Sequence, residues 1–342
     1  MLLLREITGH EQIIRALLNA LLYDRVGHAY LFAGPEGVGK ATTALAFARS
    51  LLCAGPDKGD ACGSCRACRQ FEHANHPDLH CVRPEGSSIK IEQIRGIQRK
   101  VMFHSYQGGR KVIIIEQAEA MTSEAANCLL KTLEEPPDET VFILLTALPQ
   151  ILPSTVLSRC QQFNFKLIPF NQLNSLLYNR HGLARDEAGL LAALSGGSLG
   201  KALAYASGSF QKERDAALRL TVLLKEAGAL EALEEAEKVS KNRDNALGLL
   251  EMLACWFRDL LVWKETGEAR LLFNPDQIIA LEKETGYFET GRLVEIIEDI
   301  TKAKTKVLGN ANTRLVLEAL FLRLAGGISG TQTDWEVYQW DC

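Results

Sequence analysis

The chain has 342 residues, of which 47% are hydrophobic and 23% charged, and its formal net charge is −4. This length exceeds what one hydrophobic core usually serves and predicts two or three domains. The slightly acidic balance argues against a generally basic nucleic-acid binder, although it leaves room for a local basic groove. The apolar run Leu2–Leu4 is too short for a signal-peptide core, and no stretch reaches the roughly 18–20 apolar residues of a membrane helix. We therefore expect a cytoplasmic protein.

The first 166 residues alternate between predicted strands and helices. Helical apolar spacing over residues 11–23 precedes a buried strand at 29–33, a glycine loop and an alanine-rich helix at 40–53. Further strands are expected at 79–82, 112–115, 141–146 and 161–165, with helices at 91–102 and 123–135 between them. Continuous apolar strands that alternate with helices are typical of a parallel sheet buried on both faces. The pattern predicts an α/β domain with a parallel sheet over residues 1–166.

Strand signals end after Pro169, and the rest of the chain is predicted to be helical. Residues 167–207 hold short helices interrupted by glycines, and long amphipathic runs follow at 218–227, 246–263 and 293–307. We expect a small helical region over 167–207 and a larger helical domain over 208–328. Residues 329–342 are expected to form a mostly polar tail with three aromatic residues: Trp335, Tyr338 and Trp340.

The segment Gly34-Pro35-Glu36-Gly37-Val38-Gly39-Lys40 has the pattern of a phosphate-binding P-loop. Its glycines let successive N–H groups face a phosphate, and the lysine reaches the outer phosphates. Residue 41 is alanine, whereas the pattern places there a hydroxyl that sits on Mg²⁺. Thr42 and Thr43 point elsewhere, because neighbouring helical residues lie about 100° apart. The loop therefore predicts a degenerate nucleotide site made of five residues: Gly34, Gly37, Gly39, Lys40 and Thr42.

The strand at 112–115 ends in Glu116-Gln117, where an ATPase of this type carries Asp-Glu. Without a clean metal ligand or a water-activating carboxylate, the chain is expected not to turn over ATP by itself. The alternative is an active motor ATPase in which Glu116 reaches the metal through a water molecule.

Four of the nine cysteines are clustered, at Cys53, Cys62, Cys65 and Cys68. Four thiolates in a short span suit a closed, tetrahedral Zn²⁺ site, and in a reducing compartment metal is favoured over disulfides. The alternative is a loop of free thiols. His73 and His76 are rival ligands, although a lone histidine is more often a surface or hydrogen-bonded residue.

Two basic features have both a structural and a functional interpretation. Arg159 in Ser158-Arg159-Cys160 is either a solvated residue at a helix end or a group that stabilises phosphoryl transfer, in cis or in trans. Arg95 and Arg99 share a helix face, with Lys90 and Lys100 nearby. A solvated face is the simpler interpretation of this strip, and a phosphate-contacting surface is the sharper one.

These motifs together resemble the clamp-loader subunits of bacterial DNA polymerase III, a branch of the AAA+ proteins, and most closely their delta-prime branch. The residues that carry the resemblance are the segment 28–40, the four cysteines, His76-Pro77-Asp78, the segment 127–137 and Leu157-Ser158-Arg159-Cys160, with Asn310-Ala311-Asn312-Thr313-Arg314-Leu315 near the end. The resemblance implies an AAA+ domain with a zinc module at about 53–68, a helical lid and a helical collar that assembles a hetero-pentamer with gamma/tau and delta subunits. It also implies the task of the complex, which uses ATP to open the sliding clamp and place it on primer–template DNA.

Within that family, delta-prime subunits resemble the motor subunits but act as a rigid stator. Carried over, Arg159 becomes an arginine finger offered in trans to a neighbour's ATP, and the chain is part of the polymerase III holoenzyme, a nucleotidyltransferase complex, with no independent catalysis of its own. Ala41, Glu116 and Gln117 depart from the motor pattern, and Gly200 stands where motor subunits place a nucleotide-sensing arginine. A zinc-dependent nucleic-acid binder outside replication is the third hypothesis, against which the net charge and the helical C-terminal half argue.

Overall fold

The structure is a computed structural model that describes residues 3–102, 105–106, 109–137, 139–207, 209–226, 228–309 and 311–328. The chain divides into two compact units, Met1–Ala202 and Leu203–Cys342. The expected aromatic tail lies outside the described residues. Within the described residues, no helix is both long and apolar enough to span a membrane.

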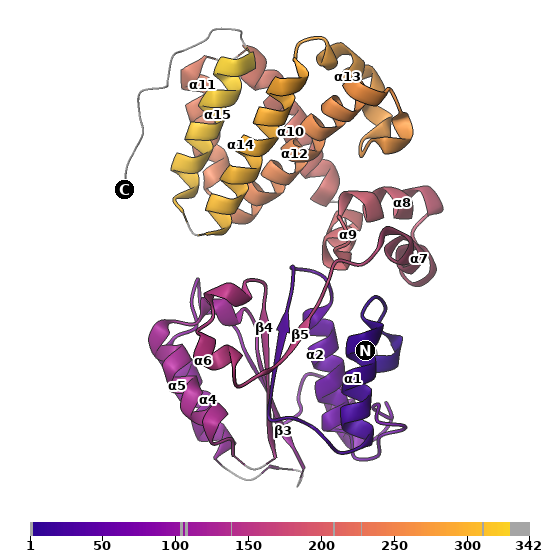
Figure 1. Ribbon diagram of the computed structural model, residues 1–342, viewed down its shortest axis with the longest axis vertical. Coiled ribbons are helices and arrows are strands. Elements are labelled where there is room, and N and C mark those ends of the chain that lie inside the picture. Colours follow the sequence, from indigo (N-terminus) through magenta and orange to yellow (C-terminus); the bar gives the residue numbers. More distant parts are fainter. Residues whose placement is uncertain are drawn as a thin grey trace. The chain divides into compact units, whose positions relative to one another are not determined.

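The first unit is built on a five-stranded parallel sheet in the order β2-β3-β4-β1-β5 (Figure 1). Its strands are β1 (Ala29–Ala33), β2 (Leu79–Val82), β3 (Lys111–Ile115), β4 (Thr140–Thr146) and β5 (Gln161–Asn164). Every residue of the three central strands β3, β4 and β1 is buried, which explains why these strands are apolar except at Lys111, Thr140 and Thr146. The parallel α/β fold expected from the sequence is confirmed.

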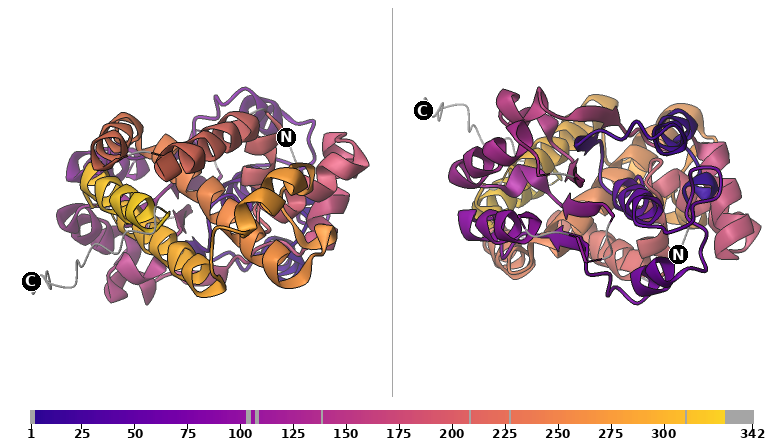
Figure 2. Two further views of the ribbon diagram at one scale, coloured as in Figure 1. Left: turned by 90° about the horizontal axis from the view of Figure 1, so that it is seen from above. Right: turned by 90° about the horizontal axis from the view of Figure 1, so that it is seen from below.

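Helices cover both faces of the sheet, as the view from below shows most clearly (Figure 2, right). Helices α1 (Glu11–Leu22) and α2 (Lys40–Leu51) pack on one face, where Leu17 and Phe47 join Tyr30 and Phe32 of β1 in the core. Helices α4 (Ile91–Val101), α5 (Ser123–Glu134) and α6 (Ser154–Leu157) pack on the other face. The sheet is thus buried between two helical layers, and its strand ends carry the loops of the candidate site.

The sequence pattern misses several short elements of this unit. They include the 3-10 turns η1 (Leu4–Glu6), η2 (Ala118–Ala120) and η3 (Pro149–Ile151) and helix α3 (Arg66–Glu72). Each is shorter than two helical turns or follows a cysteine-rich loop, so apolar periodicity does not reveal it.

Helices α7 (Phe170–His181) and α8 (Arg185–Leu194) lie near the end of the first unit, and α9 (Leu199–Ala206) crosses its boundary. Gly182 ends α7 in a left-handed conformation, with φ of 69°. Helices α7 and α8 pack together through buried side chains that include Leu173, Leu177 and Leu191. They lie within residues 167–207, where the sequence predicts short helices.

The second unit is all-helical over the residues that the structure describes there. It comprises α10 (Ser209–Glu226), α11 (Ala229–Ser240), α12 (Arg243–Thr266), α13 (Ile278–Thr285), α14 (Thr290–Leu308) and α15 (Thr313–Ile328). Helix α12 is central and packs on α10, α13 and α14. Its buried Asp259 accepts hydrogen bonds from the backbone N–H groups of Phe273 (2.9 Å) and Asn274 (2.7 Å), which fixes the connection to α13.

Candidate nucleotide site and metal centre

The P-loop connects the end of β1 to the start of α2. Gly34, Gly37 and Gly39 all have positive φ, and Gly39 is the residue that directly precedes α2. The Lys40 Nζ donates to the carbonyl oxygens of Gly34 and Pro35, at 2.7 Å for the latter. Burial lowers the pKa of Lys40, while Glu119 and Glu36 act in the opposite direction. The lysine therefore folds over the loop's own carbonyls.

The hydroxyls after the lysine do not replace the one that Ala41 lacks. Thr43 is buried, and its Oγ1 donates to the Gly39 carbonyl at 2.9 Å. Ala41 and Thr42 are exposed at the start of α2. The structure thus keeps the phosphate-facing turn of the loop. The Thr43 hydroxyl is used in a hydrogen bond to the helix backbone and is not available to a metal ion.

Ser198 and the first turn of α9 rest directly on the P-loop. The Ser198 Oγ donates to the Glu36 carbonyl at 3.0 Å, and the Gly200 N–H donates to the Gly37 carbonyl at 2.8 Å. A Cβ on Gly200 would lie 2.8 Å from the Gly37 Cα, which is closer than real contacts allow. Position 200, singled out because it lacks an arginine, therefore has no room even for a methyl group.

His10 is a further contact of the loop that sequence reasoning missed. It lies at the residue before α1, is 6% exposed, and its Nε2 donates to the Val38 carbonyl at 2.8 Å. Its ring also meets Phe165 edge-on, with 4.7 Å between the ring centroids. Burial lowers the pKa of His10, which favours the neutral ring. No local sequence pattern signals this residue, because its partners are distant in the chain.

Glu116 and Gln117 follow β3, where the sequence places them. The Glu116 carboxylate pairs with Arg83, with 2.8 Å between Oε1 and Nη2, and this pair raises the pKa of the Arg83 guanidinium. Gln117 is exposed and has a left-handed backbone, with φ of 51°. Glu119, which sequence reasoning did not consider, is the carboxylate whose charge acts most on Lys40.

Arg159 lies just after α6 at the surface of the first unit. Its Nη1 donates to the Thr155 carbonyl at 2.8 Å, and its Nη2 pairs with Glu134 of α5 at 2.5 Å. One third of the Arg159 side chain is exposed, as is about half of the Glu134 side chain (33% and 49%). The neighbouring Cys160 is buried, which raises the pKa of its thiol to about 11, so that it stays protonated.

The basic strip on α4 faces a groove shared with α5. Arg95, Arg99 and Lys131 line this groove together with the carboxylates Glu92 and Glu135, and Met102 in its lining is 80% exposed. The structure therefore adds Lys131 to the two arginines that the sequence places on one helix face.

The four clustered cysteines are brought together at one point. Cys53 follows α2, Cys62 and Cys65 lie in the next loop, and Cys68 is in α3. Their four sulfur atoms all lie within 4.8 Å of one another, and the Sγ atoms of Cys53 and Cys65 are 3.9 Å apart. Tetrahedral zinc with 2.3 Å bonds to sulfur requires sulfurs about 3.8 Å apart. The arrangement therefore fits a four-thiolate metal ion.

Backbone N–H groups support these sulfurs. The amides of Cys62, Cys65 and Cys68 donate to the sulfurs of Cys53, Cys62 and Cys65, at 3.3, 3.4 and 3.4 Å. Hydrogen bonds of this kind stabilise thiolates and orient metal ligands. His76 uses its Nδ1 to accept from the Asp78 N–H at 3.2 Å, and neither it nor His73 is part of the four-sulfur cluster.

Comparison with known proteins supports the family that the motifs indicate. The family model "DNA polymerase III, delta subunit" matches residues 9–169, and its C-terminal counterpart matches residues 212–326. The DNA polymerase III subunit delta' of Bacillus subtilis is 30% identical over 92% of this chain and 96% of its own length. The chain belongs to the delta-prime family of DNA polymerase III clamp-loader subunits. The delta' subunit of Escherichia coli is also 30% identical, over 87% of this chain and 88% of its own length. The B. subtilis tau subunit is 32% identical, although the chain spans only 61% of that longer protein.

Proposed function

We propose that this chain is the stator of its clamp loader, a subunit that hydrolyses little or no ATP itself and donates Arg159 in trans to a neighbour's ATP. The observation that carries the proposal is that residues expected to serve this chain's own nucleotide are replaced or already engaged in other contacts. Ala41 supplies no metal ligand, Glu116 is paired with Arg83, and Gly200 lies against the P-loop. Arg159, in contrast, is at the surface in an ion pair of a kind that contributes only about 0–1 kcal/mol. Releasing it to a neighbouring phosphate therefore costs little.

The proposal extends to partners and cofactors. The complex would be a hetero-pentamer with gamma/tau and delta subunits that loads the sliding clamp on primer–template DNA, and the groove with Arg95, Arg99 and Lys131 would face DNA phosphates. The metal in the cysteine cluster would be structural Zn²⁺, since all four ligands come from the protein. A reducing cytoplasm would keep these thiolates available. We retain the domain limits 1–166, 167–207 and 208–328 for the AAA+ domain, lid and collar, with the tail at 329–342.

The deciding experiment compares ATP hydrolysis by the purified chain with hydrolysis by the reconstituted complex. We expect negligible Mg²⁺-dependent turnover by the chain alone, and a stable complex whose ATPase is stimulated by DNA and clamp only when this chain is present. Turnover by the isolated chain that Lys40→Ala abolishes would instead support the motor alternative. DNA binding by the isolated chain that survives removal of residues 170–342 but not of the metal would support the third hypothesis.

A further inference from the structure

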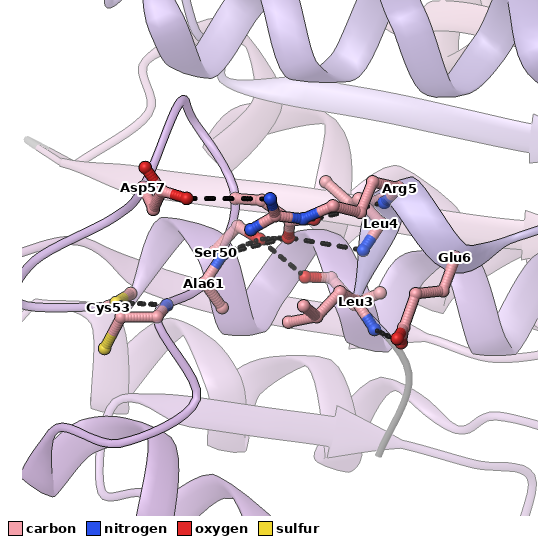
Figure 3. Close-up of polar contacts among 11 residues, drawn as sticks. Leu3, Leu4, Arg5, Glu6, Ser50, Cys53, Asp57 and Ala61 are labelled. Atoms are coloured by element: carbon pink, nitrogen blue, oxygen red, sulfur yellow. Dashed lines mark hydrogen bonds and ion pairs between the residues drawn. The ribbon is translucent and has the colours of Figure 1, made fainter.

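The loop between Cys53 and Cys62 carries an aspartate that is buried without belonging to the metal cluster. Asp60 is 1% exposed. Its Oδ1 accepts from the backbone N–H of Leu4 (3.2 Å) and from the Ser50 Oγ of α2 (3.0 Å). Its Oδ2 accepts from both the backbone N–H and the Nε of Arg5, at 3.1 and 3.3 Å. Figure 3 shows Leu4, Arg5, Ser50 and Ala61 converging around these contacts beside Cys53.

These contacts tie the N-terminal turn η1 to the metal module. A buried carboxylate needs several donors to offset the loss of hydration, and two of its donors here are main-chain amides of η1. The same loop is pressed against α1, because a Cβ on Gly59 would lie 2.9 Å from the Leu18 carbonyl oxygen. The position of Asp60 is therefore fixed by the shape of the loop that the cysteines close.

The N-terminal segment that begins with η1 also contacts the candidate nucleotide site. The Glu6 carbonyl accepts a hydrogen bond from Arg180 of α7. Gly9 lies against Ile168, since a Cβ there would be 3.0 Å from the Ile168 Cγ1. His10 bonds to the P-loop carbonyl of Val38. One segment, residues 3–10, thus touches the metal module, the P-loop and helix α7, all within the first unit.

We propose that the metal module is a tether for the N-terminal segment, with Asp60 as its anchoring residue. A metal ion held by Cys53, Cys62, Cys65 and Cys68 fixes the loop that presents Asp60 to the amides of Leu4 and Arg5. Loss of the metal frees this loop, releases η1, and removes the support that residues 3–10 give to the P-loop and α7. The inference rests on the proposed metal centre and is independent of whether the chain hydrolyses ATP.

The test follows hydrogen exchange at single residues in the full chain, with metal bound and after removal of the metal by the chelator 4-(2-pyridylazo)resorcinol. Removal should speed exchange of the Leu4 and Arg5 amides by about tenfold or more, because Asp60 is their acceptor. Amides of α5, on the opposite face of the sheet, should exchange as before. Unchanged exchange at Leu4 and Arg5 after the metal has left would overturn the tether. A purified chain that contains and takes up no metal would overturn the metal centre and the inference with it.

A pair of isosteric variants tests the anchor without removing the metal. Asp60→Asn keeps the shape and loses the charge, and we expect it to speed exchange at Leu4 and Arg5 and to release the metal to the chelator faster. Asp57→Asn is the matched control, because Asp57 lies in the same loop, pairs with the same arginine at 3.6 Å and is exposed (63%). Identical exchange and metal release in the two variants would contradict the role of Asp60.

Discussion

The environments of single residues at the candidate nucleotide site are determined by partners that are distant in the sequence, and His10 is the clearest case. Its ring is buried against Phe165, and this burial favours the neutral form in the folded protein, although the hydrogen bond to the Val38 carbonyl acts in the opposite direction. The unfolded chain has no such environment and takes up a proton at the ordinary pKa of about 6.5. A residue of this kind links the stability of the P-loop region to pH.

We predict that His10 makes the first unit less stable as the pH falls. Above pH 6.5 the ring is neutral in both states, so His10 adds no pH dependence. Below pH 6.5, His10 binds a proton in the unfolded chain but stays neutral in the folded chain, because burial lowers the pKa of folded His10. Stability is then lost by up to about 1.4 kcal/mol per pH unit until the lower pKa of the folded state is reached.

The measurement is the opening free energy of β1 amides, from hydrogen exchange corrected for intrinsic rates, between pH 7.5 and pH 5. His10→Gln keeps a donor without a titrating group and should show a shallower decline with falling pH. Because burial also lowers the pKa values of His76 and His80, the variant should keep part of the decline. Equal slopes for wild type and variant would contradict the role of His10.

At the scale of elements, Ser198 and the first turn of α9 form a latch on the P-loop through two hydrogen bonds and a glycine–glycine contact. The contact pairs Gly37 with Gly200, and Ser198 provides one of the bonds. Such a latch holds the helical region near the loop without using nucleotide as the bridge. In the stator role that we propose, the helical region would need no nucleotide to stay at the P-loop.

We predict that Gly200→Ala destabilises the first unit by about 1–3 kcal/mol, because its Cβ meets backbone that has little freedom to move. The readout is the exchange of P-loop and β1 amides. Gly189→Ala in α8 is the matched control, since no atom lies within 4 Å of its new Cβ, and alanine should stabilise the helix by about 0.5–1 kcal/mol. If both alanines stabilise the chain equally, the latch is absent in solution.

At the scale of the whole molecule, the chain combines one α/β unit with one helical unit. In the proposed role, the reaction that it assists takes place at the ATP of a neighbouring subunit. Delta-prime relatives cover most of this chain, which assigns it to a clamp loader. The proposed finger, Arg159, then acts only after assembly. Its contribution is therefore a property of the complex that no measurement on the isolated chain reveals.

We predict that Arg159→Ala lowers ATP turnover at the neighbouring site by about 10³–10⁵-fold, the range found for arginine fingers. The assay is single-turnover hydrolysis in a reconstituted complex whose other ATP sites are disabled, with assembly checked by size-exclusion chromatography. Arg159→Lys should not restore the rate, because lysine lacks the planar fork. Arg110→Ala is the control, as Arg110 pairs with Asp24 and Glu139 at the surface. Normal turnover by Arg159→Ala would remove the trans role.

The sequence by itself determined what local pattern encodes: the parallel strands, the glycine loop after β1, the cysteine spacing and the departures at Ala41, Glu116 and Gln117. Apolar runs and glycine positions determine secondary structure over a few residues, so they can be recognised without a structure. Only the tertiary structure decided the contacts of Gly200 with Gly37, of Glu116 with Arg83 and of Asp60 with the N-terminal turn. These pairs are separated by 163, 33 and about 55 residues along the chain. They exist because the folded sheet and its covering helices bring distant backbone within hydrogen-bonding range, which no local pattern records.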